Sequence, residues 1–135
     1  MIALRDALAR QTPWKPSQPA HASSTGRVLL AALPESELSA WLEGRALARL
    51  TPYTVTDPAA LRKILEQIRQ QDFCIASEEH EIGVHAVAVP LRNLQGKTVG
   101  ALNAVLPPAR MARGAIQREL LPLLQDAARE LRALL

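Results

Sequence analysis

The stretch from Asp72 to Pro108 constrains the fold most, because it has the pattern of two long strands joined by a short turn. Residues 82–91 alternate in polarity and size, and residues 97–106 form an apolar run with the two-residue period of a half-buried strand. Between them, Gly96 can adopt the positive φ that closes a turn over residues 93–96. The stretch predicts an antiparallel hairpin. A hairpin alone is marginally stable, so we expect the remaining residues to cover or extend it.

Two short helices are predicted in the first half of the chain. Residues 21–33 open with small polar residues and close in an apolar run, which is typical of a buried helix, and Ser23 or Ser24 can cap it. The free N–H groups at such a start can hold an anion, but a capped helix without a ligand explains the same residues. Pro34 ends this helix and starts a second one, which Gly44 terminates.

Two longer helices are predicted on either side of the hairpin sequence. Asp57 supplies a capping side chain and Pro58 suits the first helical position, and the residues that follow have an apolar face at helical spacing. We expect this helix to pack on one face of the hairpin. The tail from Ala115 to the C-terminus carries an apolar stripe, but Pro122 interrupts its hydrogen bonding, so a regular helix is predicted from Leu121.

The N-terminal segment has a different character. Residues 1–10 favour a short helix, and three prolines in the next ten residues deny both helix and strand pairing, as in an extended linker. The predicted organisation is therefore an N-terminal helix with a proline-rich linker over residues 1–20 and one folded domain over residues 21–135.

Composition excludes several classes of protein. A hydrophobic fraction of 48% is too high for a disordered chain, and the net charge of +3 comes from basic residues dispersed as on an ordinary solvated surface. The single cysteine, Cys74, rules out an internal disulfide, favours a reducing compartment and is expected to act as a small buried hydrophobe. No apolar run approaches the ~20 residues of a membrane span. We expect a cytoplasmic protein with no membrane partner.

Catalytic and metal sites find little support in the sequence. The acidic loop of Glu78, Glu79 and Glu81 could supply paired carboxylates, but such consecutive polar positions are more typical of a solvated loop. His80 and His85 point to opposite faces of a strand, and no third metal ligand has a recognised spacing. Phosphate-binding glycine loops and nucleophile elbows are absent from the sequence. We therefore expect no metal, no cofactor and no enzymatic activity.

Five stretches together resemble the C-terminal effector-binding domain of the IclR-type bacterial transcriptional regulators. Their order and spacing agree with that family over residues 20–135, and the similarity is greatest to the branch that responds to small aromatic acids of catabolic pathways. The stretches are HASSTGRVLLAAL from His21, PYTVTDPAALRKIL from Pro52, EEHEIGVHAVAVPL from Glu78, GALNAVLPPAR from Gly100 and the tail LLPLLQDAARELRALL.

The resemblance implies an α+β, GAF-like domain over residues 21–135, in which helices flank an antiparallel sheet and a pocket holds a small carboxylate. Ala76 and Ala86 stand where some relatives have an acidic residue and a cysteine, which favours an aromatic ligand, and strand alternation places His85 outside the pocket. The implied pocket residues are Ser24, Thr25, Ala76, Val84, Ala86 and Asn103.

The family's winged helix-turn-helix, its long signalling helix and the first strands of its effector domain have no match in this sequence. We therefore expect an incomplete sheet with an unpaired edge that favours self-association into a dimer or tetramer, and no direct contact with nucleic acid. The expected function is a ligand-sensing module that binds a small aromatic carboxylate. The alternative is an interaction protein that pairs with a full-length regulator and binds no ligand.

Overall fold

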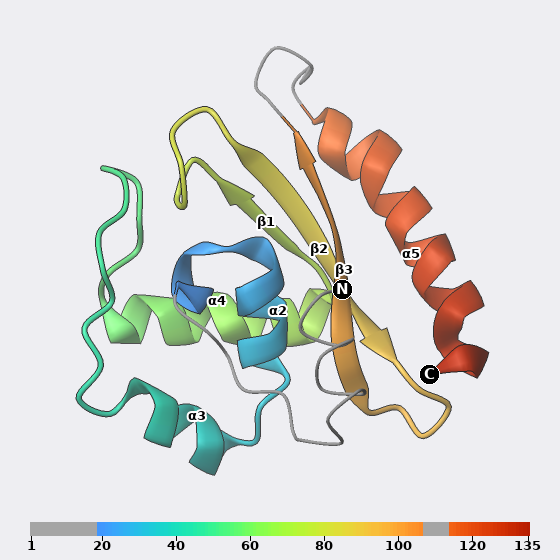
Figure 1. The fold of residues 1–135 in the computed structure, drawn as a ribbon, viewed down its shortest axis with the longest axis horizontal. Helices are drawn as coiled ribbons and strands as arrows, with labels where there is room; N and C mark the ends of the chain where they lie inside the picture. The colour runs from blue at the N-terminus through green and yellow to red at the C-terminus, as the bar shows by residue number, and fades with distance from the viewer. Residues whose placement is uncertain (1–18, 107–113) are drawn as a thin grey trace.

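The computed structural model describes residues 19–106 and 114–135 (Figure 1). The predicted N-terminal helix over residues 1–10 lies outside the described residues, as does nearly all of the linker. In chain order the elements are η1 (Ala20–Ala22), α2 (Ser24–Ala31), α3 (Glu35–Leu42), α4 (Pro58–Gln71), β1 (Cys74–Ser77), β2 (His85–Arg92), β3 (Thr98–Leu106), the π-helical turn η3 (Ile116–Leu120), α5 (Leu121–Leu131) and η4 (Arg132–Leu134).

The described strands form one antiparallel sheet in the order β1-β2-β3, and the predicted hairpin is its β2–β3 half. The hairpin turn is closed as expected: Gly96 has a φ of 81°, and the side chain of Asn93 accepts hydrogen bonds from two backbone N–H groups at 3.1 and 3.0 Å. β2 begins three residues later than predicted, because Gly83 adopts a φ of 82° within a turn that precedes the strand. β1 was not predicted, since only four residues form it.

Helices cover both faces of this sheet, which confirms the α+β class with helices flanking an antiparallel sheet (Figure 1). α5 lies along one face, while α2 packs on the other face and contacts α4 on its far side. The prediction that the helix after Asp57 packs directly on the hairpin is therefore wrong. α2 packs on the hairpin instead, and α4 covers the other side of α2. Nearly all residues of α2 are buried between these two layers.

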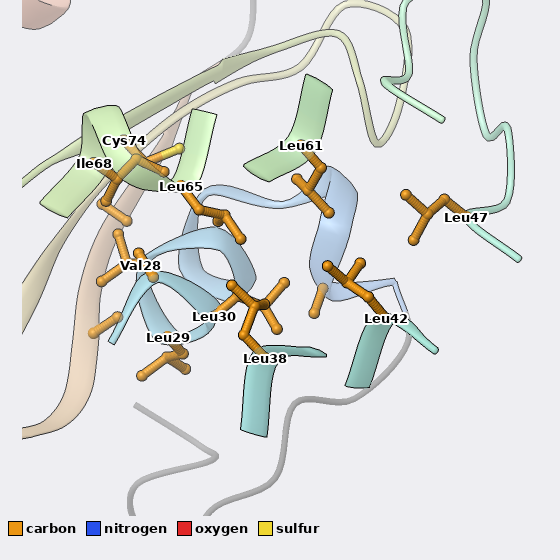
Figure 2. Packing of buried hydrophobic residues seen from close by; sticks show 14 residues of the cluster. Val28, Leu29, Leu30, Leu38, Leu42, Leu47, Leu61, Leu65, Ile68 and Cys74 are labelled. Carbon is orange, nitrogen blue, oxygen red and sulfur yellow. The ribbon is translucent and has the colours of Figure 1, made fainter. Parts of the chain in front are cut away.

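Two hydrophobic clusters follow from these layers. The first gathers side chains of α2, α3, α4 and the loop residue Leu47 around Leu30, which is fully buried (Figure 2). The second lies between α5 and the opposite face of the sheet, where Val87 and Val89 meet Leu121. Because neighbouring residues of a strand point to opposite faces, the small Ala88 belongs to the first cluster and leaves room for α2 against the sheet.

The C-terminal helix begins where Pro122 predicts. η3 ends at Leu120, and the proline falls in the first turn of α5, where the π-helical hydrogen bonding of η3 gives way to a regular α-helix. The predicted apolar stripe faces the sheet along α5, but its last residue, Leu134, is 81% exposed. This residue lies in η4, beyond the last turn of α5, and the sheet no longer covers it.

Cys74 is buried in the first cluster, as predicted. Burial raises the pKa of its thiol to about 11, since a thiolate would lose its hydration there. A thiol with so high a pKa is almost entirely protonated at neutral pH and is a poor nucleophile. The side chain therefore serves packing.

Candidate ligand-binding site

A hollow of about 280 Å³ opens on the α2 side of the sheet, near the start of α2. It is bounded by the first turn of α2, the end of β1, the loop over residues 78–84 and the end of the hairpin that lies away from its turn. All six residues expected to form a pocket line it. The full lining comprises Ala22, Ser23, Ser24, Thr25, Ala76, Glu79, His80, Glu81, Val84, Ala86, Asn103 and Val105.

The helical side of the hollow is the capped start of α2. Ser23 is the cap, one of the two residues predicted for that role, and its hydroxyl oxygen accepts a hydrogen bond from the N–H of Gly26 at 3.0 Å. Ser24 and Thr25 follow in the first turn, where backbone N–H groups lack partners within the helix and carry partial positive charge. These donors and the Thr25 hydroxyl give this side of the hollow a preference for negative charge.

The strand side is small and mostly apolar. Ala76 on β1 is paired with Ala86 on β2, and Ala86 is paired in turn with Val105 on β3, so three side chains project from one face in a row. Asn103 projects from the same face two residues away and adds an amide. Val84 was predicted to lie on the first hairpin strand, but it lies just before β2. The turn at Gly83 delays the start of that strand.

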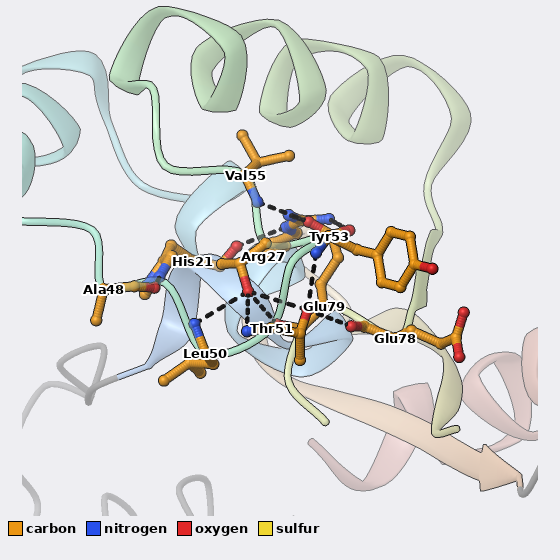
Figure 3. Close-up of polar contacts among 10 residues, drawn as sticks. His21, Arg27, Ala48, Leu50, Thr51, Tyr53, Val55, Glu78 and Glu79 are labelled. Carbon is orange, nitrogen blue, oxygen red and sulfur yellow. Dashed lines mark hydrogen bonds and ion pairs between the residues drawn. The ribbon is translucent and has the colours of Figure 1, made fainter. Parts of the chain in front are cut away.

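One residue of the acidic loop departs from the predicted solvated state. The carboxylate of Glu79 receives two hydrogen bonds from the guanidinium of Arg27, at 2.7 Å from Nη1 to Oε2 and 2.5 Å from Nη2 to Oε1 (Figure 3). The Arg27 side chain is 2% exposed and that of Glu79 is 13% exposed. A bidentate pair of this kind is strong and fixes the orientation of both groups. The interpretation of this loop as solvated is therefore wrong for Glu79.

A second loop, residues 47–56, is hydrogen-bonded to Glu78 and Glu79 of the acidic loop (Figure 3). The hydroxyls of Thr51 and Thr54 donate to the backbone carbonyls of Glu78 and Glu79, each at 2.6 Å. The N–H of Val55 donates to Oε1 of Glu79 at 3.2 Å. These bonds hold the backbone at the rim of the hollow against the body of the domain.

The turn η1 completes this polar network. Nε of Arg27 donates to the carbonyl of His21 at 2.7 Å, and Nε2 of His21 donates to the carbonyl of Ala48 at 2.8 Å. Arg27 therefore links η1, its own helix and the acidic loop. Sequence reasoning missed this role, although an arginine inside the apolar run of α2 was a signal, because a buried charge requires a partner.

Other kinds of site find no support in the described part of the chain. Among residues 19–106 and 114–135, no three His, Cys, Asp or Glu side chains are grouped so that they could hold a metal ion. Over the same residues, no helix is both long and apolar enough to cross a membrane. The hollow beside α2 is therefore the candidate site that we consider.

The chain is similar to a known family of proteins and to curated members of it. Residues 10–133 match the model of the family described as bacterial transcriptional regulator IclR, C-terminal. Two curated relatives from Acinetobacter baylyi are each 46% identical: a p-hydroxybenzoate hydroxylase transcriptional activator, over 86% of this chain, and a Pca operon regulatory protein, over 87% of it. The chain spans only 43% and 42% of their respective lengths.

Solved structures agree with the family match. The inducer-binding domain of the PobR transcription factor from Acinetobacter, a double mutant in complex with 3-hydroxybenzoic acid, has a TM-score of 0.83 and 46% identity, covering 87% of this chain and 67% of that one. The C-terminal domain of the Escherichia coli regulator KdgR has a TM-score of 0.77 and 33% identity, covering 85% of this chain and 70% of that one. The chain described here belongs to the IclR family of bacterial transcriptional regulators, and it corresponds to part of their C-terminal domain.

Proposed function

We propose that this chain is the ligand-sensing part of an IclR-type transcriptional regulator and binds a small aromatic carboxylate in the hollow beside α2. The observation that carries the proposal is the convergence of Ser24, Thr25 and Asn103 on one hollow with an alanine floor. It is supported by the 46% identity to a domain solved with 3-hydroxybenzoic acid. The relatives are regulators rather than enzymes, and the proposal assigns no catalytic step to this chain.

The lining suits the two halves of such a ligand. An aromatic ring needs an apolar surface without long side chains, and the row of Ala76, Ala86 and Val105 supplies one. A carboxylate needs hydrogen-bond donors, and the first turn of α2 supplies N–H groups next to the Thr25 hydroxyl. Asn103 lies across the hollow and can donate to a carboxylate or to a ring hydroxyl. The volume of about 280 Å³ suits a single-ring compound better than a larger effector.

Replacing Asn103 with alanine tests the assignment of the hollow. We expect Asn103→Ala to weaken binding of 3-hydroxybenzoate about tenfold, because one hydrogen bond to a charged or polar ligand group is lost. Isothermal titration calorimetry on the parent chain and the variant measures this change. The matched control is Gln95→Ala, which removes an exposed amide at the far end of the hairpin and should not affect binding. Equal affinity of Asn103→Ala and the parent would show that the ligand binds elsewhere.

The proposal includes self-association through the free edge of β3. Within the described residues, β3 pairs with β2 on one side only, it carries no charged side chain, and Val105 is 57% exposed. An uncharged nine-residue edge strand is prone to pair with another strand. The same edge supports the alternative that the chain pairs with a full-length regulator. Sedimentation equilibrium of the purified chain should give a mass above that of the 14.7 kDa monomer, and a strictly monomeric chain would contradict this part of the proposal.

We assign this chain no DNA-reading role, since its described helices build the two clusters that flank the sheet. The protein is proposed to act in the cytoplasm, where bacterial DNA and metabolic acids are both present. A gel-shift assay with the upstream region of the chain's own gene would expose a DNA-binding activity if this assignment were wrong.

A further inference from the structure

Glu79 has two structural roles at once. It lines the hollow, and its carboxylate is the partner of the buried guanidinium of Arg27. Arg27 itself is not among the lining residues, and Nε of its guanidinium donates to the carbonyl of His21. Figure 3 shows the side chain of Arg27 between His21 of η1 and Glu79 of the acidic loop. Any change in the charge of this pair therefore changes the electrostatic potential in the hollow, because Glu79 lines it.

The charge of Glu79 matters because a carboxylate ligand has the same sign. Two negative charges several Å apart in a partly buried site repel each other strongly, since the medium around them is less polarisable than water. Glu81 also lines the hollow, but it is exposed, so water and salt screen its charge. His80, another lining residue, is exposed as well. Glu79 is only 13% exposed, which leaves Arg27 as the group that neutralises it.

We propose that the Arg27–Glu79 ion pair allows the hollow to prefer anionic over neutral aromatic ligands, because the charge of Arg27 cancels that of Glu79. Arg27 acts as a positioning residue: its guanidinium cancels the charge of Glu79 and holds the carboxylate toward α2 and Val55. With the pair intact, the donors at the start of α2 decide the preference and favour a carboxylate. This inference rests on the proposed ligand-binding function and adds what determines the ligand's charge.

The test compares two ligands of nearly the same shape, 3-hydroxybenzoate and 3-hydroxybenzamide, at pH 7.5 and low ionic strength. The readout is the ratio of their dissociation constants, which cancels any effect of a substitution on the general shape of the hollow. Glu79→Gln leaves the charge of Arg27 uncompensated and should raise the preference for the carboxylate about tenfold. Arg27→Gln should lower it by a similar factor, and the double substitution should return it to within about threefold of the parent ratio.

The three variants keep the test informative even if Arg27→Gln does not fold, because Glu79→Gln and the double substitution still predict different ratios. The matched controls are Glu35→Gln and Arg62→Gln, which make the same charge changes in an exposed pair whose side chains are 66% and 39% accessible. Both controls should keep the parent ratio, since exposed charges are screened. A ratio that stays within twofold of the parent in Glu79→Gln overturns the inference.

The outcomes separate this inference from the function on which it rests. If the parent chain binds 3-hydroxybenzoate and the ratio does not respond to the charge of the pair, then the function stands and the ion pair is only structural. If the parent chain binds neither compound, the proposed function itself fails, and the inference fails with it. If all variants lose both ligands equally while remaining folded by circular dichroism, the pair shapes the hollow without selecting charge, which also overturns the inference.

Discussion

Arg27→Ala is expected to lower the free energy of unfolding by about 3–5 kcal/mol, the usual cost of removing one partner of a buried ion pair. Among the described residues, the substitution leaves the carboxylate of Glu79 with only the N–H of Val55 as a hydrogen-bond donor. It also leaves the carbonyl of His21 without the donor it has at 2.7 Å. Urea unfolding followed by circular dichroism measures the loss. Because small domains are stable by only about 5–15 kcal/mol, the variant can be close to unfolded at 37 °C.

The control for Arg27→Ala is Arg62→Ala. Arg62 also donates to a glutamate, Glu35, and the hydrogen bond lowers the pKa of the Glu35 carboxyl, but this pair is exposed to solvent. Its loss should leave the urea midpoint almost unchanged, since solvent and salt screen such pairs. Similar midpoint shifts in the two variants would contradict the account, because they would mean that the burial of Arg27 has no energetic consequence.

Gly26→Ala is expected to lower the free energy of unfolding by about 3 kcal/mol, at the upper end of the usual cost of overpacking. A Cβ at this position would clash with the carbonyl oxygen of Ala20 and would lie 2.7 Å from Oγ of Ser23. The first contact is with backbone, so η1 must move away from α2. The gain of about 1 kcal/mol in helix propensity cannot offset this displacement. Thermal and urea unfolding both report the change.

Gly44→Ala separates the steric effect at Gly26 from the general cost of replacing a glycine. Gly44 has a φ of 66°, and a Cβ there would meet no atom of the described residues within 4 Å, so the left-handed backbone conformation is what opposes the substitution. The expected cost is about 1–2 kcal/mol. If Gly26→Ala were as stable as the parent chain, then the close approach of η1 and α2 would be wrong, and with it the geometry of the hollow that the two elements share.

The parts of the fold that the sequence predicts depend on local interactions. The hairpin is recognisable because its polarity alternates and because Gly96 and Asn93 suit its turn. α4 is recognisable because Asp57 caps it and Pro58 occupies its first position, and the side chain of Asp57 does accept hydrogen bonds from two N–H groups of the first turn. In each case, residues close in sequence carry all the information.

The layer order is not local, and its prediction failed. α4 has a clear apolar face, so it was expected on the sheet, but that face meets α2. Helical periodicity shows that a face is buried and does not show what covers it. α2 is buried on nearly all sides, which leaves no single apolar face for a periodicity argument to identify.

Part of the candidate site was predicted from the sequence, and part of it was missed. The six expected pocket residues came from resemblance to a family, and the structure gathers all of them around one hollow. The Arg27–Glu79 pair joins residues 52 positions apart, and the sequence gives no rule for choosing between Glu79 and its acidic neighbours. The choice depends on the turn of the loop after β1, where Glu78 has a φ of 58° and Thr51 and Thr54 hold the backbone.

The central claim is that the hollow beside α2 binds a small aromatic carboxylate, and a thermal melt of the purified chain with 3-hydroxybenzoate tests it most directly. At about 100 times its dissociation constant, a ligand that binds only the folded state adds about 2.7 kcal/mol to the free energy of unfolding. The account predicts that the midpoint rises by several degrees with hydroxybenzoates and not with acetate at the same concentration. A cooperative melt whose midpoint no hydroxybenzoate changes, even at millimolar concentration, would contradict the account.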